Sequence, residues 1–193
     1  MDPTQVRQSA GLIFVFVILG LMAIMWMAVR FHNEVLRPDE ATLSLGENLK
    51  RSFGYLGRTI LLGFIVGIPL AIVSGILSPI LMQSGALFAV LMLIFACIVG
   101  WVLYRLSPIL PAGAIAKPIS MGQAWEATRN YSSALFTLVI LLVAIDWALG
   151  FLLGRLPWPL SILSLAVDWF VLIVGVSLYT TLYGVAVEGR KLH

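Results

Sequence analysis

The sequence predicts an all-α membrane protein, a polytopic transmembrane helical bundle with five spans. Hydrophobic residues make up 61% of the chain and charged residues only 11%, and the mean hydropathy is +1.03. A soluble domain is about half apolar and about a quarter charged. The apolar residues gather in five long runs, and none of the twelve Lys and Arg residues lies inside a run. We therefore expect lipid to be the solvent for most of this chain.

Each apolar run is long enough to cross a bilayer as a helix. A spanning helix needs about 20 mostly apolar residues, and each span must be helical because lipid cannot satisfy an open backbone. The expected spans are Ala10–Val29, Thr59–Met82, Ala86–Tyr104, Ser133–Gly154 and Leu160–Val187. Only short connections join the second span to the third and the fourth to the fifth. Both pairs are therefore expected to form antiparallel hairpins.

The basic residues predict the direction of the spans. Arg7 and Arg155 lie on one side of the membrane, and the other ten Lys and Arg residues lie on the opposite side. Cytoplasmic loops carry an excess of Lys and Arg. This rule predicts a periplasmic N-terminus, with both long loops and the C-terminus in the cytoplasm. Because the basic residues sit at membrane borders, the pI near 9.3 does not indicate nucleic-acid binding.

A short motif occurs twice and suggests an internal repeat. Ser44–Leu49 recurs 76 residues later as Ser120–Trp125, and each copy has Ser followed three residues later by Glu or Gln. That spacing is typical of a capping box at a helix start. We predict one transmembrane domain over residues 1–193, with parallel repeat-like units at about 10–82 and 86–154 and a fifth span at 160–187. The alternative is chance similarity between two juxtamembrane segments.

Both copies predict a short amphipathic helix on the cytoplasmic surface of the membrane. In the first copy, apolar residues from Leu45 to Leu56 share one face, and basic residues lie elsewhere. Such a helix lies in the interface, with its cations near anionic headgroups. Arg105 is expected to snorkel as an interfacial anchor, or to contact a lipid phosphate together with other cations. The expected headgroup or interface residues are Lys50, Arg51, Arg58, Arg105, Lys117 and Arg129.

The second loop resembles a known bacterial pattern. Arg105–Ala112 (RLSPILPA) and Gln123–Arg129 (QAWEATR) are similar to the R-L-…-L-P-A … E-A-W-…-T-R-G pattern of uncharacterised polytopic proteins. That family includes the YciC-like proteins and the membrane domain attached to some glycerophosphodiester phosphodiesterases. Asn130 stands where the family often has Gly. The resemblance covers about 30 residues; it implies a bacterial inner-membrane protein and brings no catalytic residues.

Two intramembrane acids are the sharpest functional candidates. Asp146 and Asp168 each precede a tryptophan, and each lies 11 residues from Pro157 in the predicted turn. At about 1.5 Å rise per residue, both should lie at similar depth, roughly a third of the way in from the outer face. An ionisable residue inside a span is a functional-site hypothesis by default. The pair could share a proton or bind a cation, each could make a separate local polar contact, or both could meet a basic residue of a partner.

Rows of small residues mark candidate packing faces. Gly63, Gly67, Ala71 and Gly75 recur every four positions in the second span, and Gly150 and Gly154 do so in the fourth. Such rows let helix backbones approach closely, either within the chain or with another subunit. Random glycine placement is the alternative.

No motif indicates catalysis, a cofactor or a metal. His32 and His193 lie outside the expected spans, and the lone Cys97 lies inside one. We find no P-loop, zinc motif, nucleophile elbow or dinucleotide fingerprint. We expect a non-catalytic subunit, or an assembly or scaffold protein, of a larger bacterial inner-membrane complex. Its expected partners are the lipid bilayer and a membrane protein or a second copy, with no nucleic acid. The alternative is a small proton-coupled transporter or lipid-handling protein that uses Asp146 and Asp168; an enzyme ranks third.

Overall fold

The computed structural model describes residues 3–40, 43–81, 85–157 and 160–191, and the regular structure in these residues is entirely helical. The α-helices are α1 (Pro3–Leu36), α2 (Leu45–Leu81), α3 (Gly85–Leu106), α4 (Ile109–Ala114), α5 (Met121–Ala127), α6 (Ser132–Leu153) and α7 (Leu163–Ala186). Single-turn 3₁₀ helices are η1 (Pro38–Glu40), η2 (Arg129–Tyr131) and η3 (Leu160–Ile162).

Five helical stretches in the described residues are long and apolar enough to cross a membrane: Gly11–Leu36, Leu45–Ser78, Gly85–Ala114, Arg129–Leu153 and Leu163–Ala186. The expected all-α fold with five spans is therefore confirmed, and the chain is a multi-pass membrane protein. Helix α1 continues past Val29, and α2 begins well before Thr59. The reason is that Arg, Lys and Glu are good helix formers, so a helix need not end where its apolar run ends.

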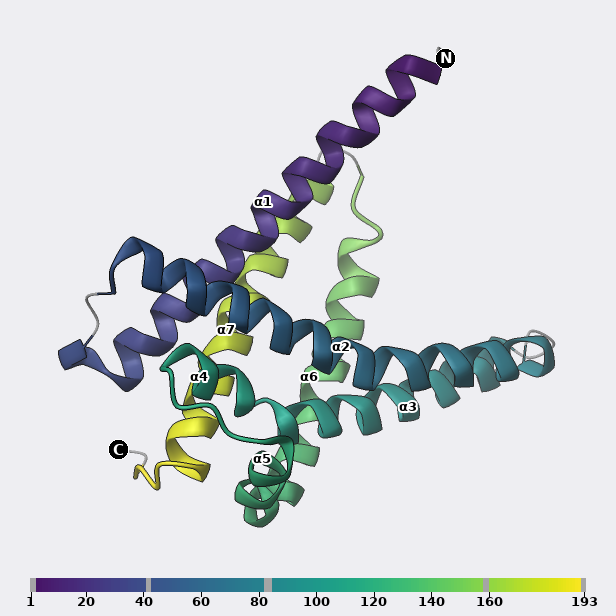
Figure 1. The fold of residues 1–193 in the computed structure, drawn as a ribbon. Helices are drawn as coiled ribbons and strands as arrows, with labels where there is room; N and C mark the ends of the chain where they lie inside the picture. The colour runs from purple at the N-terminus through teal and green to yellow at the C-terminus, as the bar shows by residue number, and fades with distance from the viewer. Residues whose placement is uncertain (1–2, 41–42, 82–84, 158–159, 192–193) are drawn as a thin grey trace.

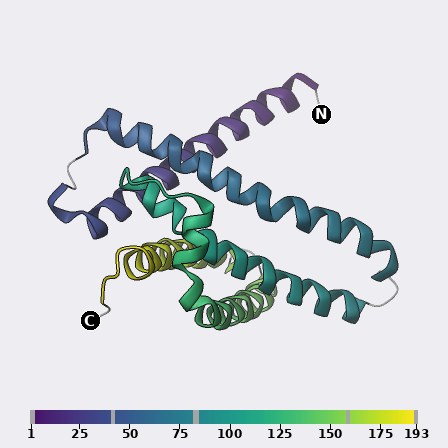
Figure 2. The same cartoon turned by 60° about the horizontal axis from the view of Figure 1, so that its bottom comes forward.

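The helices meet at one end of the molecule, here called the base. The C-terminal ends of α1, α3 and α7 and the N-terminal ends of α2 and α6 gather there around α4 and α5 (Figures 1 and 2). Nearly all of the described residues that are buried lie in the base. Within the five long helices, the buried positions run from Met25 onward in α1, up to Leu62 in α2, from Arg105 onward in α3, up to Val139 in α6 and from Thr180 onward in α7.

Helix α4 lies at the centre of the base. All six of its residues are buried, and it contacts α1, α2 and α7. The buried C-terminal end of a helix must find donors for its free carbonyl groups. Here the Asn33 side-chain amide and the Arg51 guanidinium each donate to the Ala114 carbonyl oxygen, at 3.0 Å. Two polar side chains from neighbouring helices thus make burial of α4 possible.

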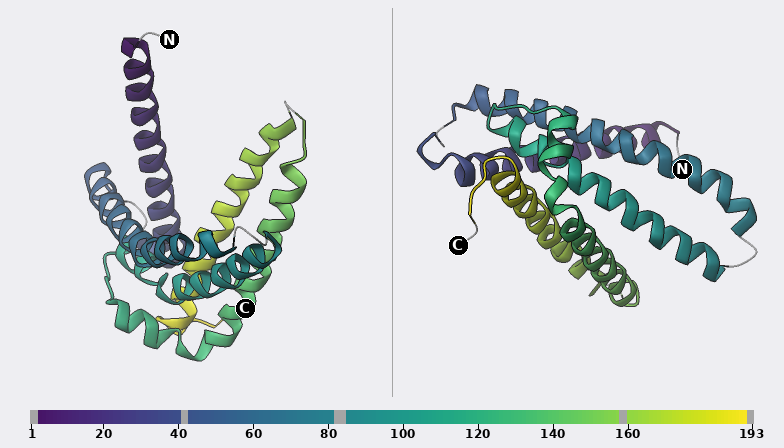
Figure 3. Two further views of the ribbon diagram at one scale, coloured as in Figure 1. Left: turned by 90° about the vertical axis from the view of Figure 1, so that its right-hand side faces the viewer. Right: turned by 90° about the horizontal axis from the view of Figure 1, so that it is seen from below.

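Away from the base the long helices diverge. The α2–α3 hairpin, α1, and the pair α6 and α7 point in three different directions (Figures 1 and 3). In α1, eight consecutive residues from Leu12 to Leu19 are all 43% exposed or more. Consecutive residues cover every side of a helix, so no described part of the chain packs on this stretch. In a bilayer, lipid or another protein would cover it.

The short surface helix expected before the second span is not a separate element. It forms the first part of the continuous helix α2. Leu45 and Phe53 are exposed, whereas the face that packs against the protein carries Asn48, Ser52 and Tyr55, all buried. The polar face thus points inward: the Tyr55 hydroxyl bonds His32 of α1, the Ser52 hydroxyl donates to the Asn48 carbonyl oxygen of its own helix, and Asn48 Oδ1 has no partner among the described residues. The amphipathic pattern alone did not predict this arrangement.

The second copy of the repeated motif does form a separate helix. At Ser120 the predicted capping box is complete, since the Ser120 hydroxyl accepts from Gln123 N–H and Gln123 Oε1 accepts from Ser120 N–H. In the first copy only the serine half forms, because Glu47 pairs with Arg51 instead. Parallel duplication stays a prediction.

Candidate functional site

Asp146 and Asp168 line the same gap between α6 and α7. The gap holds about 360 Å³ and is also lined by residues of the Gly150 and Gly154 face of α6. The two helices run in opposite directions and pack only sparsely against each other in the described residues. The sequence predicted that both carboxylates lie at similar depth on two antiparallel helices. Their position at one gap is consistent with that prediction. Part of the connecting turn, Trp158–Pro159, lies outside the described residues.

Neither carboxylate has a partner among the residues that the structure describes. Both side chains are exposed, and no ion pair or hydrogen bond engages them. The guanidinium of Arg155 instead lies over the Phe151 ring, 3.7 Å from its centroid. A charged Asp at the centre of a membrane helix costs up to about 3 kcal/mol. The pair must therefore be hydrated, protonated or neutralised by a group from outside the described residues.

The gap offers two carboxylates and little else for a ligand. No group of three or more His, Cys, Asp or Glu side chains suitable for a metal occurs among the described residues. Two carboxylates in a partly apolar gap can hold a proton, a monovalent cation or a basic side chain. Trp147 and Trp169, the residues that follow them, are each 49% exposed. These tryptophans do not belong to the lining of the gap, and their exposure shows that both indoles face outward from their helices.

The predicted glycine rows face outward as well. A Cβ atom built at Gly63, Gly67, Gly75 or Gly150 would meet nothing within 4 Å, and one at Gly154 would meet only a carbonyl oxygen of its own helix. Ala71 in the same row is exposed. No described helix of this chain therefore packs on these rows. Contact within the chain is therefore excluded for the described residues. Contact with another subunit stays a prediction, and random glycine placement stays its alternative.

Two long helices approach closely at a glycine that the row pattern did not single out. A Cβ at Gly100 of α3 would lie 2.7 Å from Val139 Cγ1 of α6. Gly113 of α4 similarly makes room for the guanidinium of Arg58, which would lie 2.3 Å from an added Cβ. Gly100 follows Ala96 by four positions but is part of no row longer than that pair, and Gly113 has no small residue four positions away, so the tertiary packing is what identifies both.

The predicted interface cations divide into two groups. Lys50, Lys117 and Arg129 are exposed, as expected for residues near headgroups. Arg51 and Arg58 instead turn toward α4. Arg51 binds the Asn33 side-chain oxygen at 2.9 Å as well as the end of α4. Arg51 thus joins α2 to α1 and α4. Arg58 donates to the Gly54 carbonyl oxygen of its own helix and lies against Gly113 of α4, so neither arginine lies free on the membrane surface as expected.

Arg105 is buried and does not snorkel. Its guanidinium stacks on Trp125, 3.7 Å from the ring centroid, and lies 5.4 Å from the Trp101 ring centroid. It also donates to Thr128 Oγ1 and to the Trp125 carbonyl oxygen. A guanidinium is weakly hydrated and stacks well on aromatic faces, which makes Arg the suited cation for such a site. Arg105 is buried because α5 folds back over the end of α3 and covers it.

Sequence reasoning placed His32 at the membrane border and missed its role. His32 is fully buried; its Nδ1 lies 2.7 Å from Thr180 Oγ1, and its Nε2 lies 3.1 Å from the Tyr55 hydroxyl. Thr180 Oγ1 donates to the Val176 carbonyl oxygen, so it accepts from Nδ1–H, and Nε2 accepts from Tyr55. The chain of donors assigns neutral His32, which links α1, α2 and α7. The sequence did contain one indication of this role, a histidine just after an apolar run. If such a side chain is buried, it needs hydrogen-bond partners from other helices.

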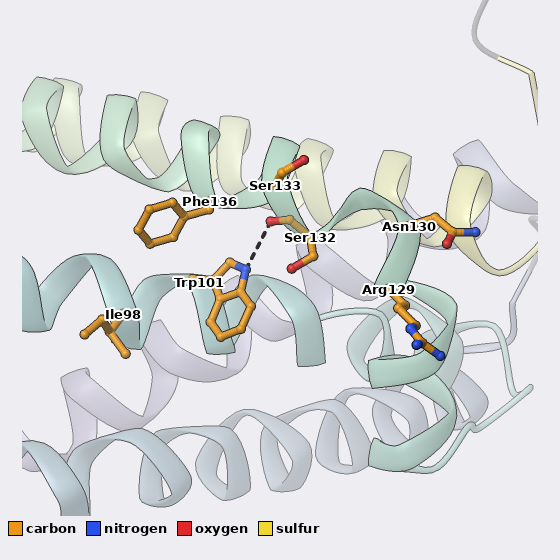
Figure 4. A pocket seen from close by; sticks show the side chains of 7 residues that line it. All are labelled: Ile98, Trp101, Arg129, Asn130, Ser132, Ser133 and Phe136. Carbon is orange, nitrogen blue, oxygen red and sulfur yellow. Dashed lines mark hydrogen bonds between the residues drawn. The ribbon is translucent and has the colours of Figure 1, made fainter.

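A second cavity lies at the base between α3 and the start of α6. It holds about 600 Å³ and is lined by Ile98, Trp101, Arg129, Asn130, Ser132, Ser133 and Phe136. Figure 4 shows Trp101 reaching from α3 toward α6, where its indole N–H donates to the Ser132 carbonyl oxygen at 3.1 Å. The predicted interface residue Arg129 thus borders a cavity, which the sequence did not indicate.

Comparison of the chain with protein-family models, curated proteins and solved structures finds no match. The resemblance of the second loop to YciC-like proteins therefore stays a prediction. Its most distinctive residue, Arg105, has a clear structural part in the base, so the motif is explained here by packing.

Proposed function

We propose that this protein is a non-catalytic integral membrane subunit, or assembly scaffold, of a larger complex in a bacterial inner membrane. One observation carries the proposal: Asp146 and Asp168 border one gap, and neither has a partner within the described chain. Two charged carboxylates inside the membrane would cost up to about 6 kcal/mol together. A Lys or Arg of a partner helix entering the gap would remove most of that cost.

The surfaces around the gap suit a helix of another protein. Gly150 lies on the same gap, and nothing lies within 4 Å of a Cβ added to it. Small residues let a second helix approach closely enough for van der Waals contact and short polar contacts. The Gly63–Gly75 row of α2 offers a second such face, distant in sequence from the first. A protein with two free docking faces and a rigid base is suited to joining other subunits.

The proposed orientation places the base in the cytoplasm. Ten of the twelve basic residues lie on the base side by the topology of the five spans. The excess of Lys and Arg on cytoplasmic segments supports this direction. The gap between α6 and α7 then lies toward the periplasmic face. The proposed location in a bacterial inner membrane rests on the resemblance of the second loop to the bacterial family pattern.

Co-purification of charge variants tests the proposal. The full chain is purified in a mild detergent at native expression, and bound proteins are quantified by mass spectrometry. We expect a stoichiometric membrane partner with wild type and at least about a tenfold loss in the Asp146→Asn, Asp168→Asn double variant. The control is Glu126→Gln, which removes an exposed carboxylate on α5 and should retain the partner.

Two outcomes would contradict the scaffold proposal. One is a wild-type protein that purifies as a lone monomer. The other is a double variant that retains its partner in full. A differently tagged second copy of the chain, expressed together with the first, distinguishes a homo-oligomer from a complex with another protein.

Proton-coupled transport is the second candidate, because both carboxylates border one cavity. Repeated halves and intramembrane acids are common in transporters. In proteoliposomes with an internal pH dye, a transporter would move protons with its substrate and lose that flux in the double variant. A scaffold would show no flux in either form. The two candidates therefore differ in a measurement made without any partner.

A further inference from the structure

The cavity between α3 and α6 has a polar end and an apolar end. Arg129 and Asn130 lie at the base, just before α6 begins. Phe136 lies about 10 Å further along the chain axis, at about 1.5 Å per residue, and Ile98 faces it from α3 (Figure 4). Arg129 also begins the fourth membrane-spanning stretch. The polar end therefore lies at headgroup level and the apolar end at the level of acyl chains.

The polar end supplies donors that this chain does not use. The side chains of Asn130 and Ser132 have no hydrogen bond to any described residue. Arg129 is 74% exposed, and among the described residues its side chain is held only by a 3.3 Å contact with Glu126, which is 69% exposed. Such an exposed pair is weak and opens readily. Among the described residues, the lining of the cavity contains one cation, Arg129, the neutral polar side chains of Asn130, Ser132 and Ser133, and no carboxylate.

The wall opposite Arg129 is firmly held. The Trp101 indole donates to the Ser132 carbonyl oxygen and makes edge-to-face contacts with Trp125 and Phe136, with ring centroids 5.6 and 6.5 Å apart. A fixed aromatic wall loses little conformational entropy when a ligand binds. The aromatic wall is therefore preformed, whereas the exposed side chains of Arg129 and Asn130 extend away from it and reorient on binding (Figure 4).

We propose that this cavity binds one anionic phospholipid from the leaflet at the base. The phosphate is held by Arg129 with Asn130 and the Ser132 hydroxyl, and an acyl chain lies along Ile98 and Phe136. An anionic headgroup fits because the net charge of the lining is positive, and a water-soluble anion would leave the apolar half unused. Charge-assisted hydrogen bonds from a guanidinium to phosphate are the strongest contacts available here. The inference is independent of the α6–α7 gap and of any protein partner.

Lipid titration of the purified full chain tests the proposal. Detergent-solubilised protein is titrated with dioleoyl phosphatidylglycerol or dioleoyl phosphatidylcholine, and bound lipid is counted by native mass spectrometry. We expect phosphatidylglycerol to bind the first site more tightly, and Arg129→Gln to weaken it about tenfold. Lys50→Gln removes an exposed cation outside the cavity and should leave the first site unchanged.

A second variant separates a shaped site from general surface charge. Ser132→Phe keeps every charge and fills the mouth of the cavity, so it should abolish the first site. Thr137→Phe places the same side chain on the exposed surface of α6 outside the cavity lining and is its control. The proposal is overturned by equal binding of the two lipids, by equal effects of Arg129→Gln and Lys50→Gln, or by full binding in Ser132→Phe. Size-exclusion profiles confirm that each variant is folded.

Discussion

The hydrogen-bonded chain through His32 gives a quantitative prediction about the base. The perturbation is a double-mutant cycle with Tyr55→Phe and His32→Leu. Tyr55→Phe removes the donor to Nε2 and leaves that nitrogen buried without a partner. A buried polar atom left unsatisfied costs about 1–3 kcal/mol, and we expect that loss of unfolding free energy. His32→Leu removes both bonds, so its expected cost is larger, about 2–4 kcal/mol.

The double variant distinguishes a hydrogen-bonded pair from two separate packing effects. With both polar groups removed, neither the Tyr55 hydroxyl nor Nε2 remains unsatisfied. Thr180 keeps its bond to the Val176 carbonyl oxygen. We therefore expect the double variant to be more stable than the sum of the single losses predicts, by about 1–3 kcal/mol.

The assay is equilibrium unfolding in mixed detergent micelles with increasing sodium dodecyl sulfate, followed by circular dichroism. The Ser177→Ala variant is a suitable control, because Ser177 lies on α7 near Thr180 and bonds only its own helix, to the Ile173 carbonyl oxygen. It should change the unfolding free energy by less than about 0.5 kcal/mol. Strictly additive losses in the cycle would refute the assigned direction of the His32 bonds and their energetic coupling.

Two further predictions concern the glycines. Gly100→Ala should destabilise the protein by up to about 2 kcal/mol in the same unfolding assay, because its Cβ would lie 2.7 Å from the stiff Val139 side chain and overpacking outweighs the gain in helix propensity. Adding Val139→Ala should relieve the clash. An unchanged stability of Gly100→Ala would contradict the close packing. Gly67→Leu should leave the unfolding free energy of the isolated chain unchanged or raise it by up to about 1 kcal/mol, because nothing lies within 4 Å of a Cβ at this position and Leu favours a helix more than Gly does. A marked loss of stability would show that α2 packs internally there.

The sequence specified the spans but not how they are arranged. Hydropathy placed all five, because a bilayer demands about 20 apolar residues and a closed backbone whatever the neighbours are. The boundaries differed at α1 and α2, where charged helix formers extend the helices beyond the membrane border. The capping box at Ser120 could also be predicted from the sequence, because its bonds join residues three apart in the chain.

The candidate residues divide in the same way. The antiparallel hairpin placed Asp146 and Asp168 at one gap from spacing alone. Arg51 and Arg105 do not lie at the surface as expected, because each bonds or stacks with a group far away in the sequence, and Arg58 lies against Gly113 of α4. A basic residue near a span looks the same in sequence whether it meets a headgroup or a carbonyl at the end of a buried helix.

The sequence by itself therefore determined that this is a five-span helical membrane protein, because the solvent acts on each segment independently of the others. Only the tertiary structure decided that α4 is buried, that His32 joins three helices and that the glycine rows face outward. Those features depend on which distant groups meet. In lipid, apolar surface is no guide to that choice, because hydrocarbon solvates an apolar side chain as well as another helix does.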